Sequence, residues 1–197
     1  MIKFYTNREL SQKLEINLAK WKRWSREFLP PDPLGGLQSG YARQFNPNEA
    51  FAVYLGGHLV ADLKFTIPEA KTILQDLKGW LVARGFQFDT KGNSEPKEGV
   101  ESLVKRYRIF IIRYQGAPEN EKDLCYNIRG LISNRSVEHM GFQVMEERYF
   151  ETSIGRQTVD IESMSTDSVK VLNINGVLER FIDKLQQGRE NYQALSC

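Results

Sequence analysis

The chain has 197 residues, of which 41% are hydrophobic, and its 27 Lys and Arg nearly balance its 25 Asp and Glu. This length allows one large domain or two small ones, with enough apolar residues for a packed core. No segment approaches the roughly 20 consecutive apolar residues of a membrane-spanning helix. No signal-like segment is recognised, and the two cysteines are too far apart in sequence to indicate a disulfide framework. We therefore expect a cytoplasmic protein that does not contact membranes.

Positive charge is concentrated near the N-terminus. Residues 1–46 hold eight Lys and Arg against four Asp and Glu, whereas the formal net charge of the whole chain is only +2. The remaining residues are therefore mildly acidic. The asymmetry points to a cationic surface in the first part of the chain.

The first predicted elements are two short helices joined by a tight turn. Thr6 and Glu9 form a capping box that begins a helix over residues 7–14. A two-residue turn follows, and Asn17 is a favourable N-cap for a second helix, which Pro30 ends. Two short helices in this arrangement are typical of a helix-turn-helix, whose second helix normally enters the major groove of DNA.

The second helix has one aromatic and one cationic face. Trp21, Trp24 and Phe28 fall within about 60° of one another at helical spacing, and we interpret them as core residues. The opposite face can contact a regularly spaced negative charge such as that of duplex DNA, although a merely solvated surface is the alternative. The candidate DNA-contacting residues of this helix are Lys20, Lys22, Arg23 and Arg26.

A loop and a short extended segment come next. Residues 30–40 are rich in proline and glycine, and residues 41–45 read as an extended piece with aromatic residues on both sides of Arg43. A loop of this kind directly after a recognition helix is a wing. Tyr41 and Arg43 are therefore further candidate DNA contacts, with Arg43 reaching a phosphate or the minor groove. The alternative is an Arg43 that stacks on Tyr41 or Phe45 at the surface.

Two longer helices are predicted after the wing. Capping signals begin them at about residues 47 and 67, and they extend over 47–63 and 67–84, with Gly85 ending the second. Gly56 and Gly57 in the middle of the first cost about 1 kcal/mol each relative to alanine, so we expect a close packing contact there. The predicted apolar stripe of the first helix is Phe51, Tyr54, Leu55, Leu59 and Leu63.

Residues 5–75 resemble the winged-helix domain of MerR-type transcriptional regulators. The matching segments are YTNREL, RWSREFLP, GYARQF and KFTIPEAKTIL, in the order and spacing of the family. The resemblance implies phosphate contacts by Lys22 and Arg43, and distortion of promoter DNA. Arg23 replaces the first of the family's usual pair of aromatic residues, and Trp24 keeps the second.

The second half of the chain is predicted to be a separate α+β domain. We expect a DNA-binding domain over residues 1–86, a linker over 87–100 and a dimerisation or effector domain over 101–197. An antiparallel sheet covered on one side by two helices is the predicted layer arrangement. Its predicted elements are a strand at 103–115, a helix at 120–133, a hairpin of 141–153 and 156–164, a strand at 168–174 and a last helix with Leu178, Phe181, Ile182 and Leu185 on its inner face.

This second half departs from the MerR-type pattern. The helix ending near Gly85 is too short for the family's dimerising coiled coil, and no cysteine of a metal sensor lies near it. Cys125 is interpreted as a buried inert thiol. Neither Cys125 with His139 nor the carboxylates Glu146, Glu147, Asp160 and Glu162 form a recognisable catalytic or metal-binding pattern.

The sequence therefore predicts a mostly α winged helix-turn-helix followed by a small α+β domain. We expect a transcriptional regulator, not an enzyme, that binds a two-fold symmetric DNA site as a homodimer without metal or cofactor. An effector is left open. The alternatives are a protein-interaction or assembly module, and an accessory protein of a mobile element that uses the winged helix without transcriptional control.

Overall fold

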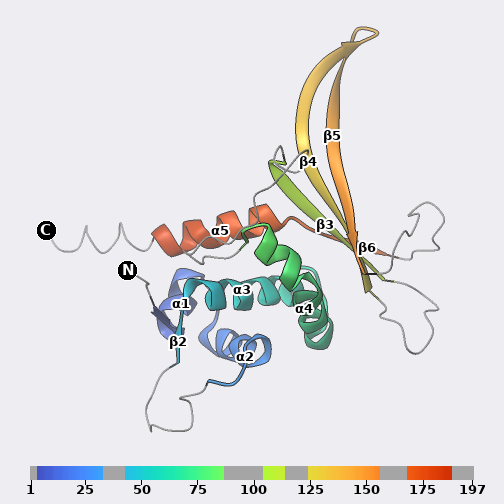
Figure 1. Ribbon diagram of the computed structural model, residues 1–197. Coiled ribbons are helices and arrows are strands. Elements are labelled where there is room, and N and C mark those ends of the chain that lie inside the picture. The colour runs from blue at the N-terminus through green and yellow to red at the C-terminus, as the bar shows by residue number, and fades with distance from the viewer. Residues whose placement is uncertain (1–3, 33–42, 87–103, 114–123, 156–167, 188–197) are drawn as a thin grey trace, which may run out of the picture. The chain divides into compact units, whose positions relative to one another are not determined.

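A computed structural model describes residues 4–32, 43–86, 104–113, 124–155 and 168–187. Within these ranges the chain has mixed α+β architecture with two antiparallel sheets (Figure 1). In chain order the elements are β1 (Tyr5–Thr6), α1 (Asn7–Lys13), α2 (Leu18–Phe28), β2 (Gln44–Phe45), α3 (Pro47–Ala61), α4 (Ile67–Ala83), β3 (Arg106–Arg113), β4 (Leu124–His139), β5 (Phe142–Ile154), β6 (Val169–Leu172) and α5 (Ile174–Gln187).

The chain divides into two compact units. One comprises Met1–Asn93 with Gly176–Cys197, and the other comprises Ser94–Asn175. This division differs from the expected one at its C-terminal end, because α5 from Gly176 onward groups with the N-terminal helices. The reason is a packing contact: the ring of Phe181 lies 5.3 Å from the rings of both Phe51 and Tyr54 in α3, measured between centroids.

The capping signals read from the sequence are confirmed in the helical unit. Thr6, Asn46 and Thr66 each accept a hydrogen bond from the backbone of the glutamate three residues later, whose side chain bonds back to the cap. Each arrangement satisfies two backbone donors that the start of a helix leaves open. At the other end of α4, Gly85 has a φ of 76°, a conformation that favours glycine, and its N–H bonds to the carbonyl of Val82.

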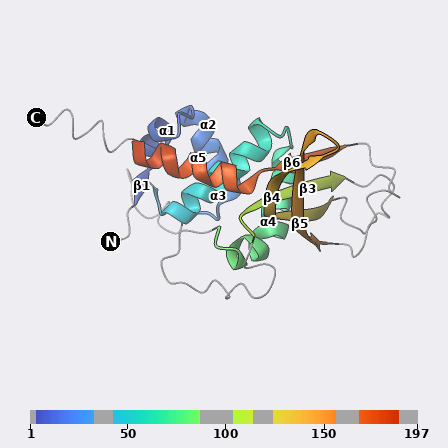
Figure 2. The same cartoon turned by 90° about the horizontal axis from the view of Figure 1, so that it is seen from above.

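Helix α3 lies in the middle of the helical unit. Its buried residues occur all around the helix rather than along the single stripe expected from the sequence, and Tyr54 and Leu63 of that stripe are half-buried. α2 and α4 pack against α3, and Figure 2 shows α5 running alongside it. The buried residues of α3 are Ala50, Phe51, Val53, Leu55, Gly56, Gly57 and Leu59.

The second unit contains a four-stranded antiparallel sheet in the order β5-β4-β3-β6. β3 is an interior strand, as its apolar residues 109–112 predict, because it pairs with β4 on one side and β6 on the other. Ile109 and Ile111 face the same side as their partners Ile128 and Tyr126, and all four are buried. These residues form the core face of the sheet.

The helix predicted over residues 120–133 is wrong. Residues 124–139 form strand β4 instead, and residues 120–123 lie outside the described ranges. Leu124, Ile128, Leu131 and Ile132 do have helical spacing, but Leu124, Tyr126, Ile128 and Gly130 also alternate, and all four are buried. A short apolar run satisfies both periods, and here pairing with β3 decides in favour of the strand.

The longest strands, β4 and β5, continue beyond the rest of the sheet as a two-stranded ribbon (Figure 1). Pairing of β3 with β4 ends at Leu131, whereas β4 and β5 remain paired to His139 and Phe142. The turn between them contains Met140 and Gly141, both with positive φ. A two-residue turn with positive φ at both positions matches the twist of the flanking strands.

The expected hairpin is therefore only partly visible. Its first strand corresponds to β5, whose hairpin partner in the structure is β4 rather than the following segment. Residues 156–164, with Asp160 and Glu162, lie outside the described residues. The expected strand at 168–174 is confirmed as β6 (Val169–Leu172), and the last helix is confirmed as α5.

Candidate nucleic-acid interface

The turn between α1 and α2 fixes where α2 begins. Glu15 has a φ of 56°, which is a left-handed conformation outside the helical range, and the Ser11 hydroxyl donates to the carbonyl of Ile16 over 2.7 Å. The Asn17 side chain then accepts hydrogen bonds from the amides of Ala19 and Lys20, at 2.9 and 3.3 Å. These bonds satisfy backbone donors at the start of α2, as predicted for an N-cap.

The aromatic face of α2 is held against α3 by the two adjacent glycines. A Cβ atom at Gly57 would lie 2.3 Å from the Trp24 ring, and one at Gly56 would lie 2.6 Å from the Phe28 ring. Only glycine leaves room for these rings, which confirms the close contact expected from the sequence. On the same aromatic face, Trp21 is fully buried and meets Phe45 of β2 edge to face at 5.9 Å. The rotation of α2 about its axis is thereby fixed.

The opposite face of α2 carries exposed positive charge. Lys20, Lys22, Arg23 and Arg26 are all exposed, and no acidic residue lies in the first turn of the helix. The Lys20 ammonium lies 4.8 Å from the centroid of the Trp24 ring. Within the described part of the chain, Lys22, Arg23 and Arg26 form no ion pair. Lys22, Arg23 and Arg26 therefore form an exposed positive surface opposite the aromatic face, whereas Lys20 lies beside the ring of Trp24.

The one acidic residue of α2 is turned toward another helix. Glu27 pairs with Lys71 of α4 at 2.6 Å. The hydrogen bond from Lys71, its charge, and the nearby Arg23 and Arg26 hold the pKa of Glu27 below its ordinary value. Lys71 is therefore the main partner of this carboxylate, ahead of the Arg23 and Arg26 charges.

The side chain of Arg43 forms contacts within the protein in this structure. Its guanidinium donates to the carbonyl of Pro30 at 2.8 Å and to the carboxylate of Glu49 at 3.3 Å, and only 17% of the side chain is exposed. It also lies over the ring of Phe45, 5.4 Å from the centroid. Arg43 thus joins the end of α2 to the start of α3, which corresponds to the alternative of a stacked arginine. Tyr41 falls outside the described residues.

Helix α5 contacts the turn between α1 and α2, and the sequence does not reveal this contact. The Lys184 ammonium pairs with Glu15 in the turn at 2.5 Å and donates to the carbonyl of Leu14, while Lys13 donates to the carbonyl of Leu185. The hydrogen bond and charge of Lys184 lower the pKa of Glu15. More than 160 residues separate Glu15 from Lys184 in the sequence, and neither belongs to a recognisable motif.

The other candidate groups do not come together. Cys125 is a free, buried thiol, and burial raises its pKa, which makes the reactive thiolate scarce. It lies near the start of β4, whereas the exposed His139 ends that strand. Glu146 and Glu147 are on β5 and pair with Arg135 and the Tyr149 hydroxyl, respectively. A search of the described residues finds no group of three or more side chains suited to hold a metal ion.

Comparison with known proteins gives no family for this chain. No protein-family model matches it, and its sequence matches no curated protein significantly. Among the described helices, none has the length and apolar content needed to cross a membrane.

Proposed function

We propose that the chain is a DNA-binding transcriptional regulator in which α1 and α2 form a helix-turn-helix, as in MerR-type regulators. Most of the predicted wing, residues 33–42, lies outside the described residues. α2 is the recognition helix. Each copy reads half of a two-fold symmetric site, so the protein acts as a homodimer. The proposal is supported above all by one observation: three exposed cations, Lys22, Arg23 and Arg26, share the face of α2 opposite its buried aromatic residues.

The arrangement of these charges favours DNA over a merely solvated surface. Packing against Gly56 and Gly57 fixes the orientation of α2, so its cations are presented on a rigid element. Glu27, which would otherwise reduce their charge, is paired with Lys71. A rigid cationic helix satisfies the two needs of major-groove binding, which are phosphate neutralisation and a fixed register on the duplex. Arg43 supports the site indirectly by joining α2 to α3.

The test is the salt dependence of binding to duplex DNA, measured by fluorescence anisotropy with the full chain. Each phosphate contact contributes about 0.9 to the slope of log K against log[salt]. The variant Lys22→Ala/Arg23→Ala/Arg26→Ala is expected to lower that slope by about 2–3 and to weaken binding strongly. The matched control removes three exposed cations elsewhere, Lys78, Arg106 and Arg108, and should leave the slope almost unchanged.

A flat salt dependence of the unaltered protein would contradict the proposal. So would equal losses in the two triple variants, because binding would then depend on net charge rather than on α2. Either result would favour the alternative of a protein-interaction or assembly module. Sites recovered by footprinting should contain two inverted half-sites, and their position relative to promoters separates a transcriptional regulator from a mobile-element accessory protein.

A further inference from the structure

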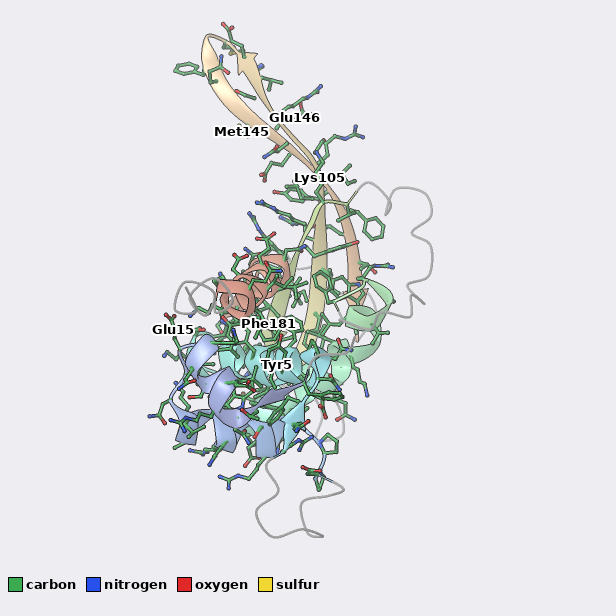
Figure 3. The ribbon with its side chains drawn as sticks, turned by 90° about the vertical axis from the view of Figure 1, so that its left-hand side faces the viewer. Tyr5, Glu15, Lys105, Met145, Glu146 and Phe181 are labelled. Carbon is green, nitrogen blue, oxygen red and sulfur yellow. The ribbon has the colours of Figure 1, made fainter. Side chains whose placement is uncertain are left out.

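Strand β5 forms an open edge of the four-stranded sheet. It is 13 residues long and stands last in the order β5-β4-β3-β6, so its outer backbone groups have no partner strand among the described residues. A long open edge offers a row of N–H and C=O groups to another extended strand. Its outer half belongs to the ribbon beyond β3, which is the segment that carries Met145 and Glu146 in Figure 3.

The ribbon also exposes apolar side chains that its own two strands cannot cover. Met140 and Phe142 are 86% and 73% exposed, and Val144 and Met145 are exposed as well. Contiguous exposed apolar residues mark an interaction site. Residues 133–148 carry two arginines against three glutamates, so the ribbon is mildly acidic and unsuited to DNA.

We propose that a second copy of this chain binds along the open edge of β5, with the two β5 strands antiparallel about a two-fold axis at Glu147. In this register Glu146 of each copy faces Arg148 of the other, and Val144 faces Phe150. On the opposite face Met145 meets Tyr149. Pairing over residues 142–152 adds about ten backbone hydrogen bonds and joins the two sheets into one.

The charges on β5 favour this register over its neighbours. Arg148 is exposed and has no ion-pair partner within the described part of the chain, whereas Glu146 pairs with Arg135 of β4 at 2.7 Å. An axis at residue 147 gives Arg148 an acidic partner on the same face. An axis at 148 places the two copies of Arg148 opposite each other, and an axis at 146 places Arg148 opposite Val144. Opposite charges stabilise a cross-strand pair, and like charges destabilise it.

Glu147 is the one unfavourable position in the proposed register. It faces its own copy across the axis, although its carboxylate accepts a hydrogen bond from the Tyr149 hydroxyl. Replacing Glu147 by glutamine removes the repulsion between the two carboxylates. The register therefore predicts that Glu147→Gln tightens the dimer, a gain that other registers do not predict.

The test is the oligomeric state of the full chain without DNA, measured by sedimentation equilibrium. Arg148→Glu sets Glu146 against a new glutamate, and Glu146→Arg sets two arginines together, so each variant alone should raise the dimer dissociation constant about tenfold or more. A 1:1 mixture of the two variants restores both opposite-charge pairs and should form a heterodimer. Lys78→Glu, a charge reversal on α4, is the matched control and should remain dimeric.

A monomeric wild-type protein would overturn the inference, as would a dimer unaffected by Arg148→Glu or a mixture that fails to form heterodimers. The β5 interface provides the homodimer that the proposed function requires, and the inference rests on that function for its two-fold symmetry. The β5 interface and the proposed function can be refuted independently. A dimer that shows no affinity for DNA refutes the proposed function alone, whereas a monomer that binds a DNA half-site through α2 refutes the β5 interface alone.

Discussion

Replacing Gly57 by alanine places a methyl group where the Trp24 ring now lies. The added Cβ atom would be 2.3 Å from the nearest ring carbon, whereas carbon atoms in contact are about 3.5–4.0 Å apart. Either α2 and α3 separate by about 1 Å to restore that spacing, or Trp24 leaves a position in which it is only 5% exposed. Both adjustments disturb the contact that orients the cationic face.

Two opposing effects set the magnitude of the change. Overpacking a well-packed core costs about 1–3 kcal/mol, and the very short approach to a buried ring places this substitution at the upper end. Alanine returns about 1 kcal/mol because glycine is the poorer helix former. The net expectation for Gly57→Ala is a loss of about 1–2 kcal/mol in the free energy of unfolding. At Gly79 in α4 nothing lies within 4 Å of the added Cβ, so Gly79→Ala should stabilise by up to about 1 kcal/mol.

Urea unfolding followed by far-ultraviolet circular dichroism measures both variants against the unaltered chain. Opposite signs are expected for two identical substitutions in two helices of the same unit, so differences in helix propensity cannot account for the result. Gly57→Ala should also weaken DNA binding, whereas Gly79→Ala should not. If Gly57→Ala is as stabilising as Gly79→Ala, then the aromatic rings of α2 do not require the glycines of α3, and the packing argument fails.

Two further outcomes follow from the helical unit. Phe181→Ala should lower the free energy of unfolding by about 3–5 kcal/mol because the ring is fully buried against α3. As the control, replacing the exposed Arg180 by alanine should change the free energy of unfolding by less than about 0.5 kcal/mol. Equal effects of the two substitutions in urea unfolding would contradict the assignment of α5 to this unit. Because the pKa of Glu27 lies below its ordinary 4.5 in the folded protein, the ion pair with Lys71 stabilises above that value and is lost as the pH falls through the lowered pKa. Unfolding curves between about pH 5 and pH 3 should therefore show a smaller loss of stability for Glu27→Gln than for the unaltered chain, and parallel losses would refute the pairing.

Local signals in this sequence predict local structure well. The capping boxes at Thr6, Asn46 and Thr66 and the N-cap at Asn17 fix helix starts, because each depends on residues only two or three positions apart. The pair Gly56 and Gly57 is also informative, since two glycines inside a helix are costly unless something packs closely against them. The sequence did not reveal that Trp24 and Phe28 are the residues in contact with them.

Features that depend on distant residues were harder to predict. Residues 124–132 satisfy both a helical and a strand period, and only their pairing with β3 distinguishes the two. Arg43 remains a predicted DNA contact, but the sequence does not reveal its pairing with Glu49, which depends on how β2 leads into α3. The sequence shows that a candidate contact residue is charged. It does not show which other groups of the protein already bind that charge.

The sequence of α3 contains more information than the single apolar stripe predicted for this helix. Seven of its residues are buried, and they occur all around the helix, which indicates a helix covered on every side rather than a surface helix with one apolar face. α2 covers the glycine side and α4 packs on another, but Phe51 and Tyr54 need a further element to bury them. Among the described residues, an element from far along the sequence provides this contact. Phe181 of α5 supplies it, and Lys184, one turn along the same helix, thereby reaches the turn that positions the cationic face of α2.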